Sequence, residues 1–95
     1  GKYVSPGFIA PHSHAAPAIG TAELAAAVPI LHQGITTVMI NPDGGGPGDL
    51  APQIADIETH VPGVNVVPMI GHNGVRKDVM GLENRKPTSA ELARM

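Results

Sequence analysis

The sequence predicts an α/β fold in which three βα units build a parallel sheet. Short apolar runs, "GFIA", "ITTVMI" and "VNVVPMI", alternate with longer segments that carry helix signals, which is typical of βαβ architecture. The chain has 95 residues, of which 42% are hydrophobic and 15% charged. This length is enough for one small domain with a packed core.

The first unit is expected to begin with a strand over residues 7–10, between Pro6 and Pro11. Proline is tolerated at the start of a strand because no ladder donor is lost there. Thr21 is a preferred N-cap residue type and predicts a helix through "AELAAAVPILHQ", with Gly34 in the C′ position. Because proline inside a helix removes a hydrogen bond, Pro29 predicts a kink or two short helices that meet near Val28.

The second and third units follow the same order. Residues 35–40 are β-branched and apolar, as expected for a strand that is covered on both faces. The loop "NPDGGGPGD" then precedes a helix from about Pro52, with Ile54 and Ile57 on one face. The third strand is expected over residues 64–70, and the loop "GHNGVRKD" and a short helical turn near Val79 come after it.

The last segment, "RKPTSAELARM", contains a capping box formed by Thr88 and Glu91. It predicts a helix whose apolar face begins with Leu92 and Met95. This helix reaches the last residue about two turns after its cap, so we expect an interrupted element. A short terminal helix that frays is the alternative.

Composition excludes several classes of protein. The net charge is −2 with scattered basic residues, which argues against nucleic-acid binding. No apolar run has the roughly 18 residues of a membrane span, and no secretory signal is visible. The absence of cysteine excludes a disulfide scaffold and a thiolate zinc site. We therefore expect a soluble, cytoplasmic protein that binds neither nucleic acid nor membranes, although Gly1 indicates a processed or trimmed chain.

His12 and His14 stand two residues apart at the end of the first predicted strand. Alternate side chains of an extended backbone share a face, so both imidazoles can reach one point beyond the strand. Parallel α/β folds place their active sites at this end of the sheet. The pair is therefore a candidate ligand set for a divalent metal such as zinc. The alternative is two loop histidines at a chance spacing.

Three blocks of the sequence resemble a known family. "VSPGFIAPHSHA" closely resembles the first-strand motif of the amidohydrolase superfamily, whose members are metal-dependent hydrolases on a distorted (β/α)8 barrel. "LHQGITTVMINPDG" looks like the next conserved block. "IGHNGVRKDVMGLENRKPTSAELARM" is similar to the block of the N-acyl-D-amino-acid deacylase (D-aminoacylase) branch. Together the blocks cover most of the chain in the order that the family has them.

The resemblance implies roles for individual residues. His12 and His14 match the two histidine metal ligands. Asp43 falls where some deacylases have a metal-contacting cysteine, and a carboxylate can also bind a divalent metal there; a simple turn residue is the alternative. His72 follows the third strand and is expected to face the barrel mouth, in contact with substrate or with a metal ligand, or else to be structural. Asp43 and His72 are thus the candidate catalytic residues, and zinc is the expected cofactor.

The remaining polar residues and the departures from the family pattern complete this interpretation. Arg76 is either a partner for a substrate carboxylate or a solvated helix charge, and His32 and His60 are expected at the surface. The family usually has aspartate where this chain has Ala10, and an acidic residue is common at the place of Ala16. Losses of this kind typically cost about 10- to 100-fold in metal affinity or activity.

A (β/α)8 barrel needs on the order of 250 residues, so three βα units are an incomplete barrel in one chain. Unpaired edges and an exposed inner face predict a homo-oligomer or association with the remainder of a longer chain. The resulting hypothesis is part of a metal-dependent hydrolase that acts on a small molecule, an N-acyl-D-amino acid, with a metal-activated water attacking the amide. One alternative is a non-catalytic metal-binding or self-associating fragment. Another is an amidohydrolase for a cyclic amide, lactone or phosphoester.

Overall fold

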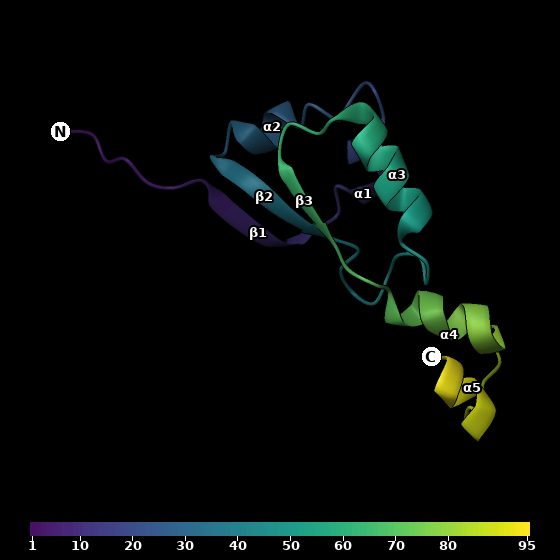
Figure 1. The fold of residues 1–95 in the computed structure, drawn as a ribbon. Helices are drawn as coiled ribbons and strands as arrows, with labels where there is room; N and C mark the ends of the chain where they lie inside the picture. Colours follow the sequence, from purple (N-terminus) through teal and green to yellow (C-terminus); the bar gives the residue numbers. More distant parts are fainter.

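The computed structural model describes residues 1–95 and contains one three-stranded parallel sheet (Figure 1). The strands are β1 (Phe8–Ser13), β2 (Ile35–Ile40) and β3 (Asn65–Pro68), in the spatial order β1-β2-β3. The helices are α1 (Ala16–Ile19), α2 (Val28–Leu31), α3 (Ala51–His60), α4 (His72–Met80) and α5 (Ser89–Arg94). Both strand pairs are parallel, which confirms the predicted α/β class with strands joined by helical crossovers.

The predicted ends of the outer strands are wrong, whereas the bounds of β2 are confirmed. The first strand does not end at Pro11 but continues to Ser13. Since β1 is an edge strand, a proline can be accommodated in it. Between Ala10 and Ser13 the register with β2 is irregular, because three steps along β1 match two steps along β2. The third strand is shorter than predicted and covers only Asn65–Pro68.

The predicted helix from Thr21 is also wrong. The helical turn α1 begins earlier, at Ala16, and the Thr21 hydroxyl donates a hydrogen bond to the Ala18 carbonyl instead of capping a helix. Residues 22–26 form turns, and Ala27 has a left-handed backbone with a φ of 49°. The predicted break near Val28 is confirmed, because α2 starts there with Pro29 in its first turn, where no hydrogen bond is lost.

The later helices are closer to expectation. Pro52 lies in the first turn of α3, as predicted. In place of a short helical turn near Val79, the nine-residue helix α4 follows Gly71 directly. The capping box of α5 is present, since the Glu91 amide donates to the Thr88 hydroxyl and the Thr88 amide donates to the Glu91 carboxylate.

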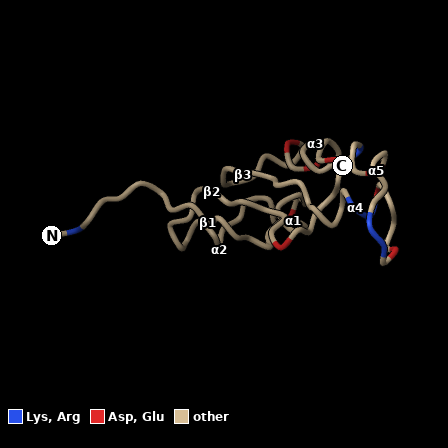
Figure 2. The backbone as a smooth tube through the Cα atoms, turned by 90° about the horizontal axis from the view of Figure 1, so that it is seen from below, with Lys and Arg blue, Asp and Glu red and all other residues tan.

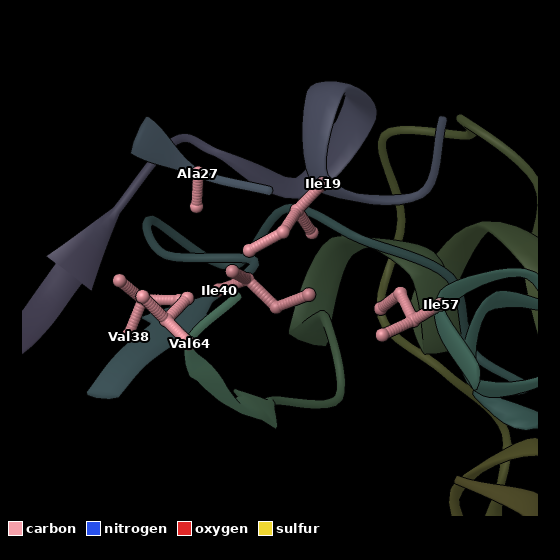
Figure 3. Close-up of a cluster of buried hydrophobic side chains, with 6 residues drawn as sticks. All are labelled: Ile19, Ala27, Val38, Ile40, Ile57 and Val64. Atoms are coloured by element: carbon pink, nitrogen blue, oxygen red, sulfur yellow. The ribbon is translucent and has the colours of Figure 1, made fainter. Parts of the chain in front are cut away.

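A small hydrophobic core lies between one face of the sheet and the first three helices (Figure 3). Its buried members are Ile19, Ala27, Val38, Ile40, Ile57 and Val64. Ala10 and Ala16 pack against this cluster, so their methyl groups contribute to the core. Each fully buried isoleucine or valine contributes about 1.5–3 kcal/mol, and this core is what holds β1–β3 against α1–α3.

The other face of the sheet has no helix over it. Alternation along the strands directs Ile9, Met39 and Val67 to this face, and none of them belongs to the core cluster. Ile9 is 64% exposed and Val67 42% exposed. The expectation that the second strand is covered on both faces is therefore wrong for this chain. The three strands contain no Lys, Arg, Asp or Glu, and most of these residues lie in the part of the chain from α3 to α5, including the segment between α4 and α5 (Figure 2).

The molecule is elongated, with extents of 61 × 29 × 18 Å. Residues 1–7 extend away from the amino end of β1, and α4 and α5 lie beyond the carboxyl end of β3 (Figure 1). The longest helix, α3, has 10 residues, and none of the helices has the length and hydrophobicity that crossing a bilayer requires.

Candidate metal centre

The irregular carboxyl end of β1 brings the two predicted histidine ligands together. His12 lies in the segment of β1 where the register shifts, and His14 is the first residue after the strand. Irregular pairing of this kind re-aims side chains at the rim of a sheet. The two Nε2 atoms lie 3.3 Å apart, and the ring planes are tilted by 58°. Both imidazoles therefore present a nitrogen to the same point.

Asp43 reaches this point from the adjacent strand. β1 and β2 are parallel neighbours, so their carboxyl ends meet at the same edge of the sheet. After Ile40 the chain turns through Asn41 and Asp43, whose φ angles are 64° and 60°. Asparagine and aspartate are the non-glycine residues that best tolerate this left-handed backbone. The turn brings Asp43 Oδ2 to 3.4 Å from His12 Nε2 and 3.3 Å from His14 Nε2.

The three ligand atoms form a nearly equilateral triangle and lie close enough to bind one metal ion. A single proton between two of these atoms cannot serve the third, because a hydrogen bond needs its proton close to the line between donor and acceptor. One cation, in contrast, could contact all three atoms at once, since they lie within reach of a common point.

The three side chains are exposed, by 59% for His12, 71% for His14 and 63% for Asp43. Ion pairs between such exposed groups contribute little on their own, about 0–1 kcal/mol. The four surface hollows, of which the largest have a volume of about 270 Å³, are lined by other residues. The candidate metal centre is therefore an open site, and these residues by themselves form no enclosed substrate pocket.

Two side-chain amides, Asn41 and Gln53, pair at the start of the Asp43 loop, and Asn41 is buried whereas Gln53 is half-buried. Asn41 is 7% exposed, and its Nδ2 donates hydrogen bonds to Gln53 Oε1 at 2.8 Å and to the Met69 carbonyl at 2.9 Å. Gln53 Nε2 donates in return to Asn41 Oδ1 at 3.1 Å. Neither residue was predicted from the sequence. The only available signal was a polar residue directly after an apolar strand, and that signal is common to many loops.

His72 does not belong to the group of three ligand side chains. It is the first residue of α4 and is exposed. The amide of the next residue, Asn73, donates to the Gly44 carbonyl, so His72 lies beside the loop that carries Asp43. Its role as a catalytic residue stays a prediction.

The Arg76 guanidinium is held by contacts within the protein. Its guanidinium donates to the carbonyls of Glu83 and Arg85 and contacts Met80 Sδ, which ties the loop after α4 to that helix. His32 is exposed at the end of α2, as expected for a surface residue. His60 ends α3 half-buried, with Nδ1 2.9 Å from the Asp56 carbonyl.

Comparisons of this chain with protein-family models, with curated proteins and with solved structures found no match.

Proposed function

We propose that this protein binds one zinc ion through His12, His14 and Asp43 and is part of a metal-dependent hydrolase of the amidohydrolase type. The observation that carries the proposal is the triangle of two imidazole nitrogens and one carboxylate oxygen, with sides of 3.3, 3.3 and 3.4 Å. The amidohydrolase part rests on the sequence blocks around these residues and on their place at the carboxyl edge of a parallel sheet.

The size of the triangle favours zinc over a hard octahedral cation. Zinc binds imidazole nitrogen and carboxylate oxygen at about 2.0–2.1 Å in tetrahedral geometry, which separates neighbouring ligand atoms by about 3.3–3.4 Å. An octahedral magnesium site with bonds of about 2.0–2.1 Å separates neighbouring ligand atoms by about 2.9 Å. Two imidazoles are also a poor ligand set for magnesium.

Three protein ligands leave one tetrahedral position open, which is typical of catalytic zinc sites. A zinc ion held there supplies Lewis-acid chemistry for hydrolysis. His12 and His14 would orient the ion from one strand, and Asp43 would add a negative charge from the next. The exposure of all three side chains leaves the open position accessible to a small-molecule substrate.

The substrate class follows from the resemblance alone. N-acyl-D-amino acids are the first candidates, because three blocks of the sequence resemble the deacylase branch. In this proposal β1–β3 correspond to the first three strands of a (β/α)8 barrel, and further strands would cover the exposed face and complete the site.

Metal binding is tested by removing metal from the protein, titrating zinc in a calorimeter and measuring zinc content by mass spectrometry. We expect one zinc per chain in the unaltered protein and loss of binding in His12→Ala and His14→Ala. His32→Ala is the matched control, because His32 is exposed and far from the triangle along the chain. Equal zinc binding by His12→Ala and the unaltered protein would contradict the proposed site.

Hydrolysis is tested separately with N-acyl-D-amino acids, a lactone and a phosphotriester as substrates. Zinc-dependent turnover of the first, lost in His12→Ala and kept in His32→Ala, supports the deacylase assignment. Turnover of only the lactone or the phosphotriester would move the protein to another amidohydrolase branch. Stoichiometric zinc binding without turnover of any substrate would show that this chain alone is a metal-binding protein and not an active hydrolase.

A further inference from the structure

We propose that Asn41 is a positioning residue for the metal centre: its side-chain amide holds the loop of residues 41–48 in the one conformation that presents Asp43 to the two histidines. This inference rests on the proposed zinc site. It concerns a residue that is two positions from Asp43 and has no contact with the metal triangle.

The proposed ligands and Asn41 differ in burial. The three ligand side chains are each more than half exposed, so solvent and neighbouring side chains place little restraint on them. Asn41 is 7% exposed, and its donors and its acceptor are all engaged with Gln53 on α3 and with the Met69 carbonyl after β3. Losing one partner of such a buried network leaves the others unsatisfied, so the network favours a single arrangement.

The loop that carries Asp43 has an unusual backbone conformation. Asn41 and Asp43 both have positive φ angles, which asparagine and aspartate tolerate but which remain less favourable than the right-handed or extended regions. Asp43 is exposed, and its turn is closed by backbone hydrogen bonds from the Gly45 amide to the Pro42 carbonyl and from the Asn73 amide to the Gly44 carbonyl. The Asn41 side chain ties the start of this loop to α3 and to the segment after β3, and without these hydrogen bonds the loop can relax to other conformations that move Asp43 away from the histidines.

The loop also folds back closely on the Asn41 side chain. A Cβ atom added at Gly46 would lie 2.6 Å from both Cβ and Cγ of Asn41. Two residues before Gly46, the Gly44 carbonyl accepts a hydrogen bond from the Asn73 amide at the start of α4. The Asn41 side chain thus lies inside the loop and joins it to α3 and to the segment after β3, while the Gly44 carbonyl joins the loop to α4.

The experiment compares zinc affinity, measured by competition with a chelator, in Gln53→Ala, Asn41→Gly and a control. Asn41→Gly keeps the left-handed backbone accessible and removes the whole side chain with its amide, although glycine also makes the backbone more flexible. Gln53→Ala removes the partner without altering the loop itself. The control Gln33→Ala also loses an amide that donates to a carbonyl, but at the opposite end of β2. We expect zinc affinity to fall about 10- to 100-fold in the first two variants and to stay unchanged in the control.

The same substitutions in an Asp43→Ala background distinguish positioning from general destabilisation. If Asn41 acts through Asp43, Asn41→Gly will cause no further loss of affinity once Asp43 is absent. An equal loss in both backgrounds would overturn the proposal, because Asn41 would then act on the fold and not on Asp43.

Amide hydrogen exchange in the metal-free protein gives a readout that does not depend on zinc binding. The amides of Gly45 and Asn73, which donate to the Pro42 and Gly44 carbonyls, report the loop directly. Exchange at least about tenfold faster in both Asn41→Gly and Gln53→Ala supports the proposal, whether or not zinc binds. Exchange at the unaltered rate overturns it. Failure of the unaltered protein to bind zinc would instead be a failure of the proposed function.

Discussion

Among the three proposed ligands, Asp43 is the one whose contribution depends most on the conformation of its surroundings. The histidines share one short segment of β1, whereas Asp43 comes from a loop that follows a different strand. Its carboxylate also carries the only negative charge among the three ligands. Loss of that charge should weaken binding of any divalent cation more than the loss of a neutral contact would.

We predict that Asp43→Asn lowers zinc affinity at least about tenfold while the fold is retained, because the amide keeps the size of the side chain but not its charge. The measurement is calorimetric titration with zinc, with circular dichroism to check the fold. Asp56→Asn on the exposed face of α3 is the matched control. Unchanged affinity in Asp43→Asn would mean that Asp43 is only a turn residue.

The residues of the candidate site differ in how far the sequence predicted them. The His12 and His14 pair follows from the two-residue alternation of an extended backbone, which is a local property. Asp43 was identified through the family resemblance, and its reach depends on two left-handed residues that no local preference requires. Asn41 and Gln53 were not identified, because their pairing joins a loop to a helix 12 positions later and is a product of tertiary packing.

Among the elements, α5 is stabilised by a network of charged and polar side chains. Arg85 Nη1 and Nη2 donate to the two carboxylate oxygens of Glu91 at 2.8 and 2.6 Å, and Arg85 Nε donates to Glu83 at 2.6 Å. The Arg85 guanidinium, followed by the Thr88 amide and hydroxyl, holds the pKa of Glu91 well below its ordinary value. Glu91 in turn raises the pKa of Arg85.

This network predicts that α5 loses helical structure in acid. A carboxyl group with a lowered pKa in the folded state stabilises that state above its unfolded pKa of about 4.3, and this stabilisation is lost as the pH falls through the folded value. We expect the carbon chemical shifts of residues 89–94 to move toward coil values below about pH 4. Glu91→Gln should show reduced helicity at neutral pH and little further change in acid, whereas Glu58→Gln on α3 should behave like the unaltered protein.

The contact between the Asp43 loop and α4 is made by backbone against backbone. A Cβ atom at Gly74 would overlap the Gly46 carbonyl oxygen and would lie 2.9 Å from the Gly48 nitrogen. Glycine inside a helix costs about 0.5–1 kcal/mol relative to alanine, so this close approach is the compensating reason for its presence in α4.

We therefore predict that Gly74→Ala destabilises the protein, by about 1–3 kcal/mol, although alanine is the better helix former. Gly20→Ala is the matched control, because an added Cβ there has no neighbour closer than 3.9 Å. Urea unfolding measures both free energies. A Gly74→Ala variant as stable as the unaltered protein would show that the loop and α4 separate without cost.

Helices and strands were predicted correctly where short-range sequence signals determine them, and wrongly where tertiary packing determines their bounds. The capping box of α5 and the proline at the start of α3 are short-range devices, and both are confirmed. The helix predicted from Thr21 was wrong although alanine is the best helix former, because tertiary packing favours a turn that buries Ala25 and Ala27. The extension of β1 past Pro11 depends on its position at the edge of the sheet, which local preferences do not contain.

For the whole molecule, the uncovered sheet face is the main feature to be explained. Ile9, Met39 and Val67 lie on one surface without a charged residue in any of the three strands. Parallel sheets in proteins are normally covered on both faces. Two strand edges are also open, since β1 and β3 each pair on one side only.

We predict that the isolated chain associates at micromolar concentrations through this surface. Analytical ultracentrifugation over a hundredfold range of concentration should show a rising sedimentation coefficient. Ile9→Lys should shift the distribution toward the monomer by placing a charge on the surface, while Leu24→Lys, an exposed apolar position outside the strands, should not. A single monomeric species at all concentrations would contradict the prediction.

The three proposed ligands come from the carboxyl ends of two neighbouring strands, β1 and β2, and this arrangement has a thermodynamic consequence. A cation shared by His14 and Asp43 would cross-link segments 29 positions apart and close the entire β1-to-β2 crossover into a ring. Such a bond restricts the unfolded chain as a disulfide does, in a protein that contains no cysteine. Metal affinity and conformational stability would then be one quantity measured in two ways, and a hundredfold excess of zinc over its dissociation constant would add about 2.7 kcal/mol to a fold with a very small interior.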